Sequence, residues 1–347
     1  MAKHTRGAPR LVERSPTVLI VGGESLLGKE LRDQLQSKHI PVTVKLISVE
    51  EEGGIRTQQE GEPVVMGPLG WRDLNGEDLN GGSAVLLAGS PESSAEALKR
   101  AQQLQPQPMI IDATGALDRK PGAGLRAPLV ESEPPRKSAI QVIAHPAAIA
   151  LTMFFKQLLS AGTMVRSMVE IFEPASERGQ RGLDELQQQT VGLLAFHKLK
   201  REVYDAQASF NMLPQYGSDA PKPLAEIELR IDRNLATLLA VEPVVPMPSL
   251  RLIQAPVFHG YSFSIWVEFE HNPGVEAVSN ALASPHIELR RSDQEPPSNV
   301  GAAGQSGIAV GSITIDRNQP RACWFWVAAD NLRIAADNAV EVISESL

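Results

Sequence analysis

The chain has 347 residues, with 33 lysines and arginines against 41 aspartates and glutamates, which gives a net charge of −8. This length suits two domains better than a single core. The acidic balance argues against a general nucleic-acid binder, and no apolar run reaches the roughly 18 residues of a membrane helix. The single cysteine, Cys323, excludes an internal disulfide and any multi-cysteine metal site. These features fit a cytoplasmic protein.

Residues 1–15 are basic, but no apolar stretch follows them. They predict a disordered tail rather than a secretion signal. Residues 17–21, Thr-Val-Leu-Ile-Val, predict a buried parallel strand. Glycines at 22, 23 and 28 and a helical stretch at 27–35 follow, which is how a dinucleotide-binding unit begins.

Short apolar strands alternate with helices through the first half of the chain. Further strands are expected at 41–48, 84–89, 108–113 and 140–144, with a helix after residue 89 and another at 147–159. The stretch 121–138, rich in proline, glycine and charge, reads as an irregular crossing. This alternation predicts a doubly wound, parallel sheet.

The second half has longer strands with partial alternation, as in an antiparallel sheet with one open face. They are expected at 162–172, 224–232, 251–259, 261–270 and 307–316, with helices at about 180–204 and 272–283 and loops at 242–249 and 291–306. The predicted fold class is therefore α/β plus α+β. A Rossmann-type domain consists of residues 16–145 together with the final helix, 332–347, and an α+β domain spans 146–331.

Several motifs match one family in order and spacing. Trp326-Val327, Asp330 to Arg333 and Asn338-Ala339-Val340 match W-V-x-x-D-N-L-R…N-A-V, with one residue fewer before Asn338. Residues 210–214, 256–262 and 179–189 match F-N-x-I-P, P-V-x-x-G-H-S and G-x-x-G-x-x-E-L-x-x-Q. Over nearly its whole length the chain resembles aspartate-semialdehyde dehydrogenases. The resemblance implies a homodimer in which a cysteine attacks an acyl phosphate and NADPH reduces the thioester.

The residues for that reaction are absent. The family's cysteine lies in N-P-N-C at a helix N-terminus, which stabilises a thiolate. The matching residues here are His145-Pro146-Ala147-Ala148, and the methyl group of Ala148 forms no thioester. The family's acid/base histidine is Tyr261, a poor base at neutral pH, and its substrate-binding arginine is Gln254, which has no charge. We expect no intact catalytic set and no phosphorylating dehydrogenase activity.

Three residues are candidate substitutes. His259 lies two residues before Tyr261 and would share its face of an unbroken strand. With His145 it makes either a rearranged catalytic or zinc-binding group, or a pair of cleft histidines without chemistry; the second is the simpler interpretation, and we expect no metal. Glu185 is kept from the family's active-site helix, as is Gln189, whereas the family's S-G-A-G is replaced by residues 176–179, Ser-Glu-Arg-Gly.

The glycine-rich turn matches the family's G-A-T-G-x-V-G, with Ser25 in place of the middle glycine. The candidate cofactor-binding residues are Gly22, Gly23, Ser25, Leu26, Leu27 and Gly28. Glu24 places a negative charge near the expected pyrophosphate, so binding of NAD or NADP stays open. Three glutamates at 50–52 would repel a 2′-phosphate and favour NAD. The family's phosphate-binding arginine is out of register at Arg119, which argues against an acyl phosphate substrate.

Three functions remain open. The first is a non-catalytic dimer that binds a nucleotide or regulates, alone or with a true semialdehyde dehydrogenase. The second is an NAD(P)-dependent oxidoreductase acting on an aldehyde by direct hydride transfer, with Tyr261 or His259 as the proton donor. The third is a structural partner that uses only its dimer face.

Overall fold

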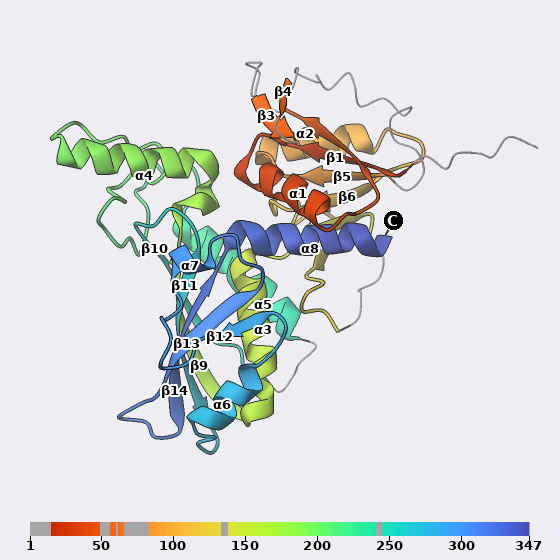
Figure 1. The fold of residues 1–347 in the computed structure, drawn as a ribbon. Helices are drawn as coiled ribbons and strands as arrows, with labels where there is room; N and C mark the ends of the chain where they lie inside the picture. Colours follow the sequence, from red (N-terminus) through yellow and green to blue (C-terminus); the bar gives the residue numbers. More distant parts are fainter. Residues whose placement is uncertain are drawn as a thin grey trace, which may run out of the picture.

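The computed structural model describes residues 15–48, 83–132, 138–240 and 245–346, and the backbone of 56–59 and 62–65. Two six-stranded sheets with covering helices make up this part of the chain (Figure 1). The predicted tail at 1–15 lies almost wholly outside the described residues, and the glutamates at 50–52 lie outside them altogether. None of the helices in the described ranges combines the length and hydropathy needed to cross a bilayer.

The first sheet is parallel throughout, with strand order β2-β1-β5-β6-β8-β7. Its strands are β1 (Thr17–Val21), β2 (Thr43–Ile47), β5 (Ala84–Leu87), β6 (Met109–Asp112), β7 (Ala123–Arg126) and β8 (Ile140–Ile143). Helix α2 (Pro91–Ala101) packs on one face, while α1 (Leu26–Ser37) and α8 (Asn331–Ser346) pack on the other. Both faces are buried, which explains why β1 and β5 read as continuous apolar runs.

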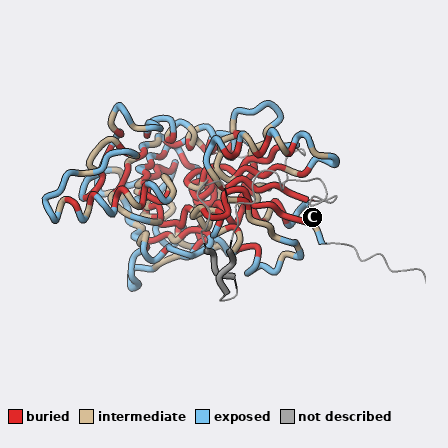
Figure 2. Tube along the Cα trace, turned by 90° about the horizontal axis from the view of Figure 1, so that it is seen from above, coloured by how far each residue is buried: buried red, intermediate tan, exposed pale blue. Residues whose placement is uncertain are grey.

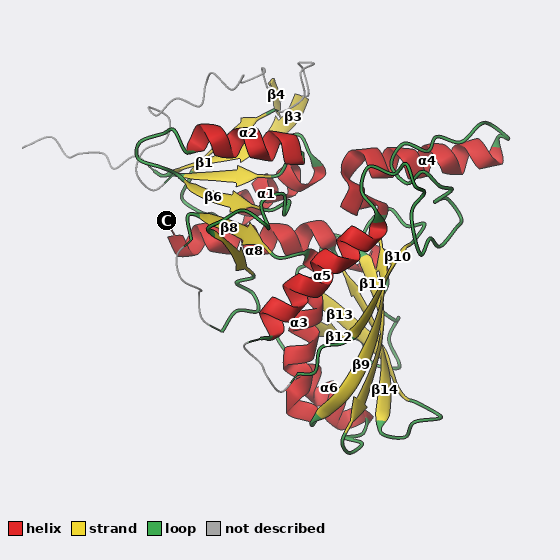
Figure 3. Ribbon diagram, turned by 180° about the vertical axis from the view of Figure 1, so that it is seen from behind, coloured by secondary structure: helices red, strands yellow, loops and turns green. Residues whose placement is uncertain are grey.

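The second sheet has strand order β10-β9-β11-β14-β13-β12, and it is mixed rather than antiparallel as predicted, because β10 pairs with β9 and β12 pairs with β13 in parallel. Its strands are β9 (Met164–Glu173), β10 (Ser249–Gln254), β11 (Tyr261–Phe269), β12 (Ile287–Leu289), β13 (Ile308–Ile315) and β14 (Ala322–Ala329). Helices α3 (Pro146–Leu158), α5 (Leu224–Leu239) and α6 (Val275–Leu282) lie along one face (Figure 3). Alternate residues are buried on this face, and the register places Met168, Trp266 and Trp324 side by side on the other, which confirms the predicted open face.

Several predicted elements are wrong. Residues 224–232 begin helix α5 rather than a strand, because the buried residues Ile227, Ile231 and Leu235 recur every four positions while the charges between them mimic a period of two. The predicted crossing at 121–138 contains edge strand β7, which is too short and polar to stand out. Helix α4 (Gly179–Leu194) ends ten residues before 204, and β10 ends at Gln254 rather than 259.

Smaller elements complete the chain. The predicted loop at 291–306 contains α7 (Asn299–Ala302), and β3 (Arg56–Gln59) pairs with β4 (Glu62–Val65) in a hairpin that was not predicted. Two 3-10 turns, η2 (Leu159–Ala161) and η3 (Ala175–Arg178), follow α3 and β9.

Helix α8 joins the two parts of the molecule. It packs against α1 and α3, and the Oδ1 atom of Asn338 accepts a hydrogen bond from the backbone N–H of Leu129 at 3.1 Å. Arg333 pairs with Glu30 of α1 at 3.0 Å. Figure 2 shows the buried segments running together through the middle of the molecule. The final helix therefore lies on the parallel sheet, as expected, while the domain boundaries stay predictions.

Candidate functional site

The N-terminus of α3 lies where the family's nucleophile is expected. His145 is the N-cap, and its Nδ1 atom accepts a hydrogen bond from the backbone N–H of Ala147 at 3.3 Å. Its own backbone N–H donates to Oδ1 of Asn234 at 2.8 Å. Ala148 is completely buried in the main core, so the structure places a packed methyl group on the first turn of the helix.

His145 and Tyr261 lie close to each other. Their ring centroids are 6.3 Å apart, and the Nε2 atom of His145 is 3.8 Å from a carboxylate oxygen of Glu177. Burial, reinforced by Arg230, Arg178 and Lys222, holds the pKa of His145 well below its ordinary value. Burial and the carboxylates of Glu177 and Glu173 raise the pKa of Tyr261 well above its ordinary value. Both shifts move the two groups away from proton exchange near neutral pH.

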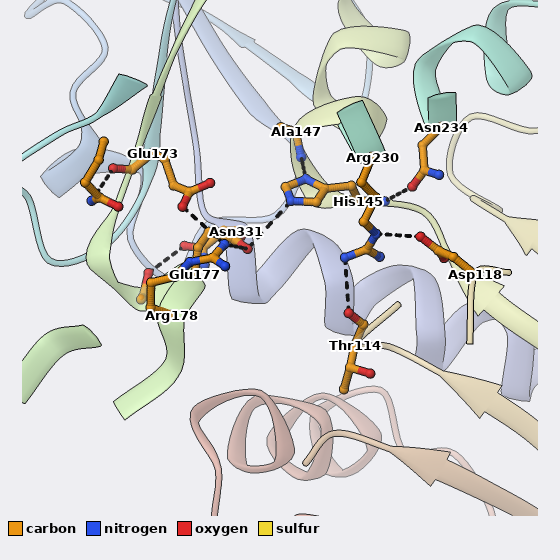
Figure 4. A network of polar contacts seen from close by, with 12 residues as sticks. Thr114, Asp118, His145, Ala147, Glu173, Glu177, Arg178, Arg230, Asn234 and Asn331 are labelled. Atoms are coloured by element: carbon orange, nitrogen blue, oxygen red, sulfur yellow. Dashed lines mark hydrogen bonds and ion pairs between the residues drawn. The ribbon is translucent and has the colours of Figure 1, made fainter. Parts of the chain in front are cut away.

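Glu177 and Arg178 occupy the space in front of His145 (Figure 4). Both side chains are 12% exposed. The guanidinium of Arg178 lies 3.1 Å from a carboxylate oxygen of Glu173 and 4.0 Å from one of Glu177. Burial, opposed by Arg178, raises the pKa of Glu173 to about 7. Charged side chains therefore fill a position where the family pattern has small residues.

Gln254 does not reach toward a ligand. It is completely buried, and its Nε2 atom donates to the backbone oxygens of Glu173 and Ala255, both at 2.9 Å. Its Oε1 atom accepts a hydrogen bond from the hydroxyl of Tyr216 at 2.6 Å. Because all its polar atoms are paired within the protein, Gln254 is not placed to bind a substrate carboxylate.

Glu185, one of the predicted substitutes, is committed to holding a loop. Its carboxylate accepts hydrogen bonds from three consecutive backbone N–H groups, those of Glu202 (2.6 Å), Val203 (2.7 Å) and Tyr204 (3.2 Å). Gln189, one turn further along α4, binds the same loop through Lys200, Ala206, Ala208 and Ser209. These two residues, kept from the family pattern, are structural in this chain.

His259 is not positioned as predicted. The strand is broken at Gly260, which has φ +80°, and β11 begins only at Tyr261. A Cβ atom on Gly260 would lie 2.7 Å from the backbone oxygen of Asn299. The assumption of an unbroken strand therefore fails for His259. Within the described ranges, no group of three or more histidine, cysteine, aspartate or glutamate residues has the geometry of a metal site.

Cys323 is no alternative nucleophile. It is completely buried on the core face of β14, opposite Val267 of β11. Burial raises the pKa of its thiol. The predicted core position of Cys323 is confirmed.

Arg230 of α5 bridges to the first sheet, a contact that the sequence did not reveal. It pairs with Asp118 at 2.7 Å and donates to the backbone oxygen of Thr114 at 3.1 Å. Gly115 has φ +73°, and a Cβ atom there would lie 1.9 Å from this guanidinium. Arg119 is exposed nearby. Arg230 and Asn234 lie one turn apart on α5, but the predicted strand at 224–232 contained only Arg230 of the two, so nothing in the sequence indicated that they face the same region.

The glycine-rich turn has the geometry expected of it. Gly22 has φ +82°, and a Cβ atom on Gly28 would lie 2.2 Å from the backbone oxygen of Gly22. Ser25 is the N-cap of α1: its hydroxyl accepts from Gly28 N at 2.9 Å and donates to Ala88 O at 2.8 Å. The hydroxyl of Ser25 is thus used within the turn.

The first turn of α1 still offers backbone donors. Within the described ranges the N–H groups of Leu26 and Leu27 have no hydrogen-bond acceptor, which is the usual state of a helix N-terminus. Such N–H groups bind phosphate in dinucleotide sites. Glu24 is buried beside them at 8% exposure, a negative charge that opposes such binding.

Comparisons with known proteins agree with this architecture. The model of the semialdehyde dehydrogenase dimerisation domain matches residues 156–334. The USG-1 protein homolog of Pseudomonas aeruginosa is 26% identical over 328 residues, covering 93% of this chain and 95% of that protein. The aspartate-semialdehyde dehydrogenase of Rickettsia bellii is 24% identical over 335 residues, covering 94% and 96%.

Solved structures show the same fold. A probable aspartate-semialdehyde dehydrogenase from Pseudomonas aeruginosa superposes with a TM-score of 0.80 at 25% identity, covering 96% of this chain and 98% of that one. An aspartate-semialdehyde dehydrogenase from Candida albicans, solved with NADP, superposes with a TM-score of 0.63 at 16% identity, covering 96% and 98%. Because the dimerisation-domain model spans more than half of its residues, the chain belongs to the semialdehyde dehydrogenase family.

Proposed function

We propose that this chain is a dimeric member of the family that does not catalyse the phosphorylating dehydrogenation and serves as a nucleotide-binding or regulatory protein. The observation that carries the proposal is the N-terminus of α3. It presents the buried methyl group of Ala148, and Glu177 lies in front of its capping residue, His145. A covalent route through a thioester has no atom on which to form.

The supporting groups are equally unsuited to that reaction. Tyr261 and His145 have pKa values displaced from neutrality in opposite directions. Gln254 has its polar atoms paired inside the protein. Restoring one residue would therefore leave the others unable to bind or protonate the substrate.

The direct test is turnover. The purified full-length chain is mixed with aspartate semialdehyde, phosphate and NAD or NADP, and reduced cofactor is followed by absorbance. An aspartate-semialdehyde dehydrogenase such as that of Rickettsia bellii serves as the positive control. We expect no signal above the blank. Turnover by the wild-type chain that disappears in His145→Ala would overturn the proposal.

Dinucleotide binding is the finer part of the proposal. It is supported by the turn at Gly22 to Gly28 and by the available N–H groups of Leu26 and Leu27. Calorimetry with NAD and NADP measures it directly. The preference for NAD stays a prediction, since residues 49–55, on which it depends, lie outside the described ranges. Absence of heat with both cofactors would leave only the structural or regulatory role.

We further propose a homodimer through the open face of the second sheet. This face exposes Met168 at 50% and Trp324 at 38%, and α4 projects on the same side and ends in the exposed Leu194 (Figures 1 and 3). The matched domain is a dimerisation domain. Met168→Glu is expected to yield monomers in light scattering. Leu229→Glu is the matched control, since Leu229 is 49% exposed on α5, a helix that packs on the opposite face. A dimeric Met168→Glu variant would contradict this interface.

The same face is open to a true semialdehyde dehydrogenase as an alternative partner. Co-purification from the native cell separates a heterodimer from a homodimer. A cytoplasmic location is proposed on the single, buried and unpaired Cys323.

A second candidate is an NAD(P)-dependent oxidoreductase acting on an aldehyde by direct hydride transfer. The observation that favours it is the closeness of His145 and Tyr261, whose ring centroids are 6.3 Å apart. Aldehyde-dependent oxidation of NADH or NADPH that is lost in Tyr261→Phe would establish it. The turnover assay without phosphate distinguishes it from the first proposal.

A further inference from the structure

Three side chains that carry hydrogen-bond donors, His145, Arg178 and Tyr261, lie around the carboxylate of Glu177. The Nδ1 atom of His145 accepts a hydrogen bond, so the neutral ring carries its proton on Nε2, which faces Glu177 (Figure 4). The guanidinium of Arg178 lies on another side of the same carboxylate. Tyr261 is the third member of the group. Its ring lies 6.3 Å from that of His145, and its hydroxyl interacts with the carboxylate of Glu177. Imidazole, phenol and guanidinium groups all donate hydrogen bonds to carboxylates in protein binding sites.

Glu177 fills this site imperfectly. Its oxygen is 3.8 Å from Nε2 of His145 and 4.0 Å from the nearest nitrogen of Arg178, both too long for hydrogen bonds. The Nε atom of Arg178 is buried without a hydrogen-bond partner, and the hydroxyl of Tyr261, which interacts with Glu177, makes no hydrogen bond of good geometry. Tyr261 is only 1% exposed, so its hydroxyl has little contact with solvent. Buried donors left unpaired are costly, so the site favours a better-placed acceptor.

The misfit follows from how Glu177 is attached. It lies on the 3-10 turn η3, whose backbone is fixed to the loop after β10 by Ala175 N to Val257 O (2.8 Å) and Ser176 N to Phe258 O (2.9 Å). The hydroxyl of Ser176 also donates to Asn331 at 3.0 Å. A tethered side chain on a fixed turn cannot move to satisfy every donor, whereas a free molecule can.

We propose that His145, Tyr261 and Arg178 form a binding site for a small free carboxylate, which Glu177 occupies from within the chain as an internal, displaceable substitute. The inference rests on the proposed function in one respect: a cleft filled by its own glutamate is not the open substrate site of an active dehydrogenase. The ligand class is a short aliphatic carboxylate, because the donors surround a single carboxylate group, that of Glu177.

Rescue of a variant without the internal carboxylate tests the site. In the full-length chain, Glu177→Ala removes the occupant and keeps the backbone of η3. Thermal unfolding is followed against sodium acetate at constant ionic strength, with sodium chloride as the balancing salt. We expect a saturable rise of Tm in Glu177→Ala, and an acetate affinity at least about tenfold higher than that of the wild type.

Three further variants make the result specific. Tyr261→Phe combined with Glu177→Ala removes one donor and is expected to lower acetate affinity about tenfold, the value of one hydrogen bond to a charged group. Glu177→Gln keeps the volume of the occupant and is expected to respond like the wild type. Glu202→Ala changes an exposed loop glutamate and is the matched control.

Each outcome decides the question. If Glu177→Ala is unfolded alone, its recovery in acetate but not in chloride supports the site, and no recovery in either salt overturns it. A rise of Tm equal in Glu177→Ala and Glu202→Ala also overturns it. Turnover of aspartate semialdehyde by the wild type would refute the proposed function instead, and the acetate experiment would still report on the site.

Discussion

Replacing Glu185 by alanine separates a structural glutamate from a catalytic one. Glu185 is 1% exposed, and its carboxylate holds the N–H groups of Glu202, Val203 and Tyr204. Hydrogen bonds to a charged acceptor contribute about 1.5–3 kcal/mol each. The N–H groups of the first two residues lie near solvent and regain water in the variant, so only part of this sum is lost. We expect Glu185→Ala to lower the free energy of unfolding by about 2–4 kcal/mol.

The assay is urea denaturation at a fixed protein concentration, because a dimer's stability depends on concentration. Amide exchange at residues 202–204 should accelerate in the same variant. Glu202→Ala is the control: its carboxylate is 57% exposed and forms a surface ion pair with Lys200, so a change within about 0.5 kcal/mol is expected. If both variants unfold at the same urea concentration and the amides stay protected, Glu185 does not hold the loop and the structural assignment fails.

Three other changes address the cleft and the turn. Burial raises the pKa of Glu173 from 4.5 to about 7, so its contribution to stability is complete below about pH 4.5 and is lost as the pH rises through about 7. Glu173→Gln should remove up to roughly 3 kcal/mol of this pH dependence of the unfolding free energy. A difference in unfolding free energy between the variant and the wild type that stays constant from about pH 5 to about pH 8 would contradict this. Ala148→Cys should place a thiol in a fully packed position, cost about 1–3 kcal/mol and give neither rapid labelling by a thiol reagent nor turnover; fast labelling with turnover would show an open, competent site. Gly28→Ala would set a Cβ atom 2.2 Å from a backbone oxygen and should abolish dinucleotide binding in calorimetry, whereas Gly192→Ala, with its nearest contact at 3.5 Å, should bind as the wild type does; equal binding by both variants would exclude the turn as the cofactor site.

The sequence predicted the features that depend on local pattern. Apolar runs such as Thr17–Val21 indicate strands buried on both faces, and the alternation in Tyr261–Phe269 indicates a strand with one open face. Both follow from which side of a strand each residue occupies. The family resemblance added the order of elements and the position of Ala148, because motif spacing survives at low identity.

Contacts between distant segments could not be predicted from the sequence. The resemblance named Glu185 as an active-site position but not its partners, and the bonds to residues 202–204 come from a loop with no motif of its own. Arg230 was hidden because residues 224–232 alternate charged and apolar side chains on a helix. The expected shared face of His259 and Tyr261 was wrong for a backbone reason: Gly260 has a positive φ, and β11 begins only after it.

Glu177 and Arg178 indicate whether the cleft has merely lost its catalytic residues or has acquired a new set of contacts. A buried guanidinium is costly without carboxyl groups beside it, and Arg178 has two: Glu173 at 3.1 Å, which Tyr216 binds in turn at 3.2 Å, and Glu177 at 4.0 Å. Simple loss of a cysteine leaves a small gap, whereas here the space in front of α3 is filled by an ion pair whose members have partners on β9 and in the loop before α5. Such a set is stable only when its parts are present together, so the cleft of this chain is a packed polar network in its own right. The Nε atom of Arg178 has no hydrogen-bond partner in this network, and the proposed free carboxylate would supply an acceptor for it.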